Sequence, residues 1–364
     1  MIVYISNNIS VMGTETNCSS KMLSGYVPVF NATAAERLIN AGITIDKKLA
    51  LNEFNMGHSE LAISLQAALK ESSEKGDKFL ALASDTGGEA RMAASGLGLT
   101  LIKPTYGSVS RYGLIENATS LDQICTIAQN TDDCAGLLSV ISGKDNKDGT
   151  CVLEEPFNFS QASGDYLKGK KIGMVKNHGT GFSAEKTTAL TDTAGLFTEA
   201  GVSVKEFEMP HLDYTFPVYY IIACAEASSN LSKYDGLKFG HRSEKADNLI
   251  DTYKLSRSEG FGWEVKKRIL FGSLVLSRDY YDKYYRKALQ GRSLIIDSYK
   301  KLFKDYDMIL APVTESINVS VNLAGLPSIA IPSPNTFQLI GPAFSERDLV
   351  TAGRLYEKLA GKKS

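Results

Sequence analysis

The sequence predicts an α/β fold in which a mixed β-sheet has helices on both of its faces. Short apolar or β-branched runs alternate with helical patterns from early in the chain, and no segment repeats. The composition agrees, since 364 residues with 43% apolar and 22% charged residues can bury a sizeable core. A disordered, fibrous or disulfide-stapled protein is thereby excluded.

The first half of the chain supplies clear signals for both kinds of element. A capping box at its start predicts a helix over Thr33–Ala41. Leucines at i, i+4 and i+8 predict a second helix over residues 59–71, and the apolar run Phe79–Ala83 predicts a buried strand. Asn130 is well placed to cap a further helix.

The second half continues the alternation around a long helical stretch. The expected elements are a strand over 172–175, a helix over 183–200, a strand over 202–207, a mainly helical region over 217–303, strands over 308–312 and 328–332, and a helix that Ser345 caps and that ends at Leu359.

Charge and cysteine content limit the possible partners. A net charge of −1, from 40 basic and 41 acidic residues, gives no general attraction to nucleic acid or to an anionic membrane. Five cysteines without CxxC spacing predict reduced thiols, and four scattered histidines form no metal-ligand pair. Because the N-terminus lacks a signal-peptide pattern and no apolar run reaches about 18 residues, we expect a soluble cytoplasmic protein without membrane contact.

The segment Ser84–Arg91, sequence SDTGGEAR, carries the most chemical information. Its two glycines, Gly87 and Gly88, allow a sharp turn after the predicted strand and leave the backbone N–H groups unobstructed. With Asp85 and Thr86 they form a loop whose N–H groups suit an oxyanion or another anion. A Gly-Gly turn by itself is more often only a turn.

Together with later segments, this loop resembles the amidase-signature family, and within it the A subunits of glutamyl-tRNA(Gln)/aspartyl-tRNA(Asn) amidotransferases. The similarity runs with gaps from about Asn7 to Leu359. The segments that carry it are Lys103–Leu114, Ser120–Gln123, Tyr219–Ile222, Glu226–Leu231, Tyr234–Gly236, Ser258–Gly262, Glu264–Ile269, Tyr280–Tyr285 and Val321–Pro327.

The resemblance implies a Ser–cis-Ser–Lys triad, and the sequence departs from it at each position. Glu89 stands where the family has its nucleophilic serine, and Ser6 stands where it has the catalytic lysine. The Gly-Gly-Ser-Ser-Gly-Gly-Ser loop that supplies the cis-serine is missing, as is the family's usual N-terminal segment. We therefore expect residues 1–364 to form a single amidase-signature-like domain with shortened loops and no catalytic residues.

The family's substrate-binding residues have better matches. Arg268 and Tyr219 match the arginine and the tyrosine that hold glutamine, and Glu315 is a candidate for the acidic residue. Simple alternatives remain open, because Arg268 could be solvated and Tyr219 could only pack. We expect Asp85 to order its loop and to pair with Arg91, and four tyrosines at 280–285 to serve in a core or a subunit interface.

The resemblance implies a catalytically impaired amidotransferase A-like protein, a scaffold or regulatory partner that is not itself an enzyme. Its expected partners are B-like and C-like subunits, with tRNA contacted only through them, and it would need no cofactor or metal of its own. Two alternatives stay open. One is an active amidase or glutaminase with a non-standard site that recruits Ser84 or Ser59, and the other is a sensor of glutamine or an amide at Arg268. An organellar matrix is a second possible location.

Overall fold

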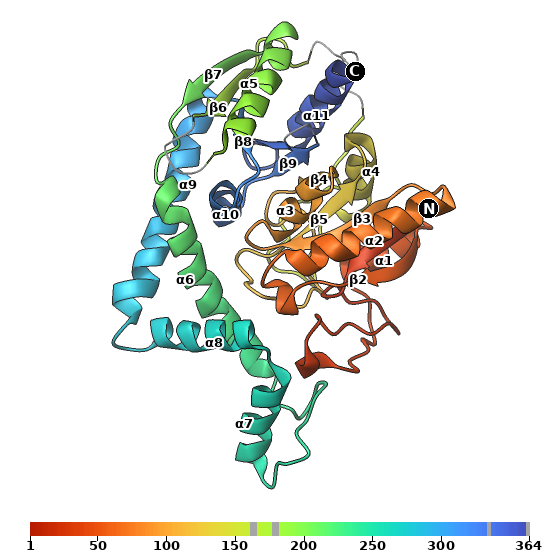
Figure 1. Ribbon diagram of the computed structural model, residues 1–364, viewed down its shortest axis with the longest axis vertical. Helices are drawn as coiled ribbons and strands as arrows, with labels where there is room; N and C mark the ends of the chain where they lie inside the picture. The colour runs from red at the N-terminus through yellow and green to blue at the C-terminus, as the bar shows by residue number, and fades with distance from the viewer. Residues whose placement is uncertain (161–165, 177–181, 333–335, 362–364) are drawn as a thin grey trace.

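A mixed β-sheet runs through the molecule (Figure 1). The computed structural model describes residues 1–160, 166–176, 182–332 and 336–361. Within these ranges ten strands form one sheet in the order β2-β1-β3-β5-β4-β9-β10-β8-β6-β7. The strands are β1 Ile2–Ser6, β2 Thr44–Leu49, β3 Leu80–Asp85, β4 Thr100–Lys103, β5 Gln123–Ala128, β6 Lys171–Val175, β7 Ser203–Phe207, β8 Met308–Pro312, β9 Ser328–Ile331 and β10 Phe337–Ile340.

The strand directions make the sheet parallel at its two ends and antiparallel in its centre. Strand β1 pairs in parallel with β2 and β3, and β6 pairs in parallel with β7 and β8. The pairs between them, from β3–β5 to β10–β8, are antiparallel, with Leu82 opposite Thr126 and Leu339 opposite Leu310. The predicted mixed α/β sheet is confirmed.

Helices cover both faces of this sheet. They are α1 Thr33–Asn40, α2 Ser59–Lys75, α3 Glu89–Gly96, α4 Thr131–Ile141, α5 Ala184–Glu199, α6 Leu212–Asn230, α7 Leu249–Gly260, α8 Trp263–Leu276, α9 Arg286–Asp305, α10 Glu315–Ala324 and α11 Glu346–Ala360. Alternate residues of β3 explain the two layers. Leu80 and Leu82 pack in one apolar cluster with α1, α4, α5 and α11, whereas Ala81 and Ala83 pack in another with α2 and α3.

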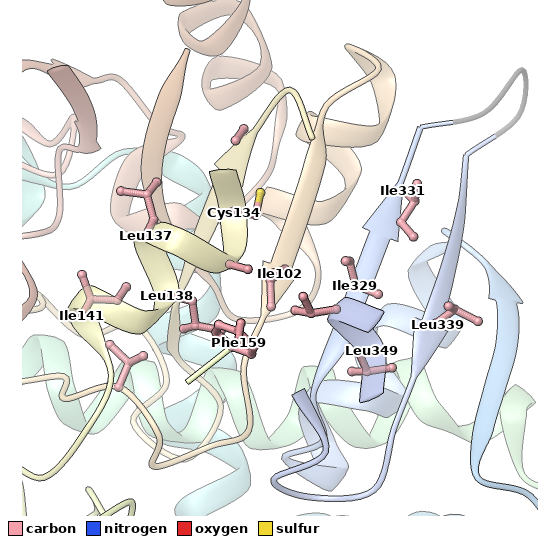
Figure 2. Packing of buried hydrophobic residues seen from close by; sticks show 14 of the residues in the cluster. Ile102, Cys134, Leu137, Leu138, Ile141, Phe159, Ile329, Ile331, Leu339 and Leu349 are labelled. Atoms are coloured by element: carbon pink, nitrogen blue, oxygen red, sulfur yellow. The ribbon is translucent and has the colours of Figure 1, made fainter. Parts of the chain in front are cut away.

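The first of these is the largest of the apolar clusters (Figure 2). Leu137, Leu138 and Ile141 of α4 point into it with Ile102 of β4, and Leu349 of α11 lies beside Ile329 of β9. The helical spacing of the apolar residues in α4 thus corresponds to burial on one face of the helix. A third cluster packs α6, α9 and α10 against β8 and β10.

Most predicted elements are present, with different caps in two of them. Asn130 caps α4 as expected, since its Oδ1 accepts the N–H of Asp133 at 2.8 Å. The capping box at Thr33 is wrong, because the Thr33 hydroxyl donates instead to Asp145 Oδ2 at 2.6 Å. Ser345 is likewise no side-chain cap, because its hydroxyl donates to the Pro342 carbonyl oxygen at 2.7 Å.

Sequence reasoning missed three elements that border the site. Helix α3 begins at Glu89, within the glycine-rich segment that the sequence indicates as a loop. Strand β5 pairs with both β3 and β4 in the centre of the sheet, and helix α10 fills the space where the sequence predicts a turn between two strands. The division of the chain into one domain over 1–364 stays a prediction.

Helices α7 and α8 and the turn that follows them carry exposed apolar side chains. Helix α7 lies at one end of the molecule (Figure 1), and Trp263 at the start of α8 is 74% exposed. A π-helical turn spans Tyr281–Tyr285, and three of the four tyrosines at 280–285 are exposed, so the prediction that they lie in a core is wrong. Their use in a subunit interface stays a prediction. No helix in the described part of the chain has the length and apolar character needed to cross a membrane.

Candidate functional site

The loop after β3 is held by a buried ion pair. The carboxylate of Asp85 lies 2.9 Å from the Arg91 guanidinium and accepts the Arg91 backbone N–H, and both side chains are fully buried. Asn322 of α10 adds bonds from its amide nitrogen to Asp85 Oδ1 (2.9 Å) and to the Thr86 carbonyl oxygen (2.7 Å). Burial opposes ionisation of Asp85, but the charge and hydrogen bonds of Arg91 outweigh it, so the pKa of Asp85 lies below its ordinary value. The predicted ordering of the loop and its pairing with Arg91 are confirmed.

The two glycines of this loop allow a close approach of other side chains. A Cβ atom on Gly87 would lie 2.5 Å from the Tyr219 hydroxyl oxygen. Gly88 has φ +104°, and a Cβ atom there would lie 2.3 Å from the Cβ of Asn318. Larger residues at either position would therefore displace α6 or α10.

Glu89, the first residue of α3, occupies the backbone N–H groups of its own loop. Its Oε2 accepts from the N–H groups of Thr86 (3.0 Å) and Gly87 (2.7 Å), and its Oε1 accepts from the Tyr219 hydroxyl (3.2 Å). Burial and the nearby charge of Asp85 raise the pKa of Glu89, while the backbone N–H groups act in the opposite direction. The N–H groups that were expected to bind an anion thus donate to a carboxyl side chain of the same protein, and an anion-binding role of the loop stays a prediction.

The hydrogen bonds that lead from Ser6 join neutral side chains. Its hydroxyl donates to Asn8 Oδ1 (2.7 Å), and Asn8 Nδ2 donates to the Ser84 hydroxyl (2.6 Å). Asn55 Nδ2 donates to the Ser84 carbonyl oxygen (3.2 Å), so the row of contacts contains amides and hydroxyls but no amine. Ser84 itself is only 2% exposed. These contacts offer no group that could take a proton from a hydroxyl nucleophile.

Asp122 is a buried acid beside the loop that sequence reasoning quoted only as part of a motif. It accepts from the Thr86 hydroxyl (2.6 Å) and from the N–H groups of Asn117 (2.8 Å) and Ala118 (3.0 Å). Burial raises its pKa to about 7. The position of Asp122 in the sequence could have indicated its role. It directly precedes strand β5, whose first residue pairs with the last residue of β3, so its carboxylate lies near the loop after β3.

A cavity of about 230 Å³ opens beside Glu89. Its lining residues are Gly57, His58, Gly87, Gly88, Glu89, Met92, Phe216, Tyr219, Tyr220, Arg268, Glu315 and Val319. The cavity thus brings together Tyr219, Arg268 and Glu315, the three residues predicted to bind ligand, from helices α6, α8 and α10. Among the described residues that line it, none is a serine, threonine, cysteine or lysine.

Arg268 is a largely buried cation in this cavity. Its side chain is 12% exposed, its Nε donates to Glu264 Oε1 (3.1 Å), and its guanidinium lies 5.6 Å from the centre of the Tyr220 ring. Its Nη1 is buried and has no hydrogen-bond partner within the described residues. The alternative of a solvated Arg268 is wrong, and a buried unpaired N–H group is suited to an incoming acceptor.

Tyr219 combines packing with a polar contact. It is 4% exposed, belongs to the apolar cluster of α6 and α10, and donates its hydroxyl hydrogen to Glu89. Burial and the Glu89 charge hold the pKa of Tyr219 well above its ordinary value. Within the described residues, no group of three His, Cys, Asp or Glu side chains has the arrangement of a metal site.

Residues 76–317 match the model of the amidase family. Over 98% of this chain and 82% of the relative, the sequence is 41% identical to the A subunit of the glutamyl-tRNA(Gln) amidotransferase of Lachnoclostridium phytofermentans. The chain belongs to the amidase family. This amidase-family chain is also 39% identical to the corresponding protein of Streptococcus thermophilus, over 97% of the chain and 81% of the relative.

Solved structures agree with this family membership. The crystal structure of the A subunit of the Thermotoga maritima glutamyl-tRNA(Gln) amidotransferase has a TM-score of 0.78 and 30% identity, with 98% of this chain and 83% of that chain covered. The peptide amidase of Stenotrophomonas maltophilia, at 19% identity and a TM-score of 0.78 over 98% and 82% of the two chains, shares the fold. The family and its fold were both predicted, and both are confirmed.

Proposed function

We propose that this protein is a non-hydrolysing member of the amidase family, a pseudo-amidase that acts as a scaffold or regulatory partner related to the tRNA-dependent amidotransferases. One observation carries the proposal: the carboxylate of Glu89 accepts hydrogen bonds from the N–H groups of Thr86 and Gly87. Its close homology to amidotransferase A subunits supports an amidotransferase-related role.

The chemistry of acyl transfer argues against hydrolysis at this position. Attack by Glu89 on an amide would produce a mixed anhydride, and its charge would repel the oxyanion that such N–H groups stabilise in active enzymes. Within the described part of the chain, the hydrogen bonds that join Ser6, Asn8 and Ser84 include no amine base. Loss of a single triad member lowers rates by several powers of ten, so loss of all three leaves little activity.

As partners we propose B-like and C-like amidotransferase subunits, with tRNA bound through them and not by this chain. The near-neutral charge favours indirect RNA contact, and the same role places the protein in the cytoplasm. The exposed apolar side chains of α7 and α8 are compatible with a protein interface.

A second candidate function, binding of an amino acid without chemistry, is favoured by one specific observation. Arg268 Nη1 is buried beside the cavity without a partner among the described residues, and Glu315 lines the same cavity. A carboxylate ligand would supply the missing acceptor. The two functions are compatible, because binding of an amino acid to a pseudo-amidase can change how it interacts with its partner subunits.

We expect purified protein to release no ammonia from glutamine above a protein-free blank in a coupled ammonia assay. Glu89→Ser should remain equally inactive, since restoring a hydroxyl does not restore the lysine or the second serine. Release of ammonia by the wild-type protein, lost in Ser84→Ala or Glu89→Ala, would support the alternative of an active amidase and refute this proposal. The A protein of an active amidotransferase serves as the positive control.

We also expect a tagged form of this chain to co-purify with B-like and C-like subunits when the three are co-expressed. Trp263→Asp, on the exposed start of α8, should weaken the complex without changing the melting temperature of the free chain, because Trp263 is 74% exposed. Size-exclusion chromatography with light scattering measures the assembly. If neither partner co-purifies with the wild-type chain, the scaffold role loses its support.

A further inference from the structure

The charges around the cavity beside Glu89 do not balance. Glu89 and Glu315 contribute two carboxylates, and Arg268 contributes one guanidinium. Glu315 is exposed to solvent, whereas Glu89 is only partly exposed. The side-chain amide of glutamine is uncharged, so it would bring no cation to the Glu89 carboxylate.

We infer that the cavity binds an α-amino acid with a second ammonium group on its side chain, such as L-ornithine, in preference to glutamine. In this arrangement the ligand carboxylate binds Arg268, the α-ammonium group lies toward Glu315, and the side-chain ammonium group binds Glu89. The inference rests on the proposed function, because it assumes that the cavity holds a ligand that is not hydrolysed.

Glu89 discriminates between the two side-chain ends because an ionised carboxylate only accepts hydrogen bonds. The carbonyl oxygen of a bound amide would need a donor at this end of the cavity. The N–H groups of Thr86 and Gly87 already donate to Glu89, and so does the Tyr219 hydroxyl. An ammonium group supplies three donors and a charge opposite to that of the carboxylate.

Arg268 fixes the other end of the ligand. Its Nε is used by Glu264, while its buried Nη1 has no partner within the described residues. A guanidinium held against the Tyr220 ring is well oriented for a carboxylate. The volume of about 230 Å³ is below the ~300–1,000 Å³ of pockets for drug-sized ligands, which suits a molecule of amino-acid size.

The test compares L-ornithine with L-glutamine by isothermal titration calorimetry, since both place the side-chain nitrogen the same number of bonds from Cα. We expect wild-type protein to bind ornithine at least about tenfold more tightly, the usual effect of one charge-assisted hydrogen bond. Glu89→Gln should lose this preference, because its neutral amide can no longer balance an ammonium group. Arg268→Gln should weaken binding of both amino acids.

The affinity for ornithine should also fall with decreasing pH in the wild-type protein. Burial and the charge of Asp85 raise the pKa of Glu89, and protonation of Glu89 removes the partner of the ammonium group. Arg268, Tyr219, Glu315 and His58 face the same cavity in both proteins, so the difference between wild type and Glu89→Gln isolates Glu89. The control variant Glu60→Gln changes an exposed glutamate in the first turn of α2 and should leave binding unchanged.

Equal or tighter binding of glutamine by the wild-type protein would overturn the inference, as would no binding of either amino acid or an ornithine affinity that Glu89→Gln leaves unchanged. Melting temperatures near that of the wild type show that the variants are folded. These outcomes are distinct from failure of the proposed function, which is decided by ammonia release from glutamine and not by affinity.

Discussion

Replacing Arg91 by leucine is expected to lower the free energy of unfolding by about 3–5 kcal/mol, the usual cost of removing one partner of a buried ion pair. Arg91 and Asp85 are both fully buried, and the guanidinium also donates to the Asn318 carbonyl oxygen (3.0 Å) and to Gln338 Oε1 (3.3 Å). Leucine would leave the Asp85 carboxylate in the interior without its counterion. Urea denaturation followed by circular dichroism measures the change.

An exposed ion pair provides the matched control for Arg91→Leu. Lys70 and Glu74 lie 3.8 Å apart on the outside of α2 with side chains that are mostly exposed. Lys70→Ala should change the free energy of unfolding by less than about 1 kcal/mol. The double variant Asp85→Asn with Arg91→Leu should recover part of the loss, because it leaves no lone buried charge. A loss below that of Lys70→Ala would mean that the ion pair does not hold the loop.

Sequence patterns predicted elements with a clear local signal better than elements whose polar residues are buried by distant contacts. Helix α4 could be found because Asn130 caps it and its apolar residues recur with helical spacing. Strand β5 could not, because Gln123 and Thr126 are polar in sequence yet buried through contacts with distant residues, including Lys103. Helix α10 was missed for a similar reason, since Asn318 and Asn322 look like turn residues. In the structure Asn318 Oδ1 accepts from Gln338 Nε2, and Asn322 Nδ2 donates to the loop of Asp85.

The candidate site shows the same division between local and distant information. Residue matching found Glu89, Tyr219, Arg268 and Glu315, and the cavity brings them together. The sequence could not tell that Glu89 turns back onto the N–H groups of its own loop, because a glutamate in a glycine-rich loop is usually solvated. Nor could the sequence show that the Tyr219 hydroxyl donates a hydrogen bond to Glu89, since that contact joins residues 130 positions apart.

Lys103 is expected to make the stability of the protein depend strongly on pH between about 7 and 9. Its side chain is fully buried on β4 and donates to the Pro104 carbonyl oxygen and to Gln123 Oε1, both at 3.0 Å. Burial is the main cause that lowers its pKa from 10.5 to about 7, and the Arg91 charge adds to it, while Asp85 and Glu346 act in the opposite direction. Below pH 7 the lysine is protonated in both the folded and the unfolded chain.

Above the folded-state pKa, the unfolded chain binds a proton that the folded chain has lost, so the free energy of unfolding increases with pH at up to about 1.4 kcal/mol per pH unit. Between pH 7 and 9 the contribution of Lys103 should therefore increase by about 2 kcal/mol. Lys103→Met removes this increase, and urea denaturation of both proteins at several pH values measures it. Other groups, such as Lys48 with its pKa lowered to about 8 by burial, change both proteins equally and cancel in the difference. Parallel stability profiles for wild type and Lys103→Met would show that Lys103 keeps its ordinary pKa in the folded protein, and with it that the polar centre of the sheet stays hydrated.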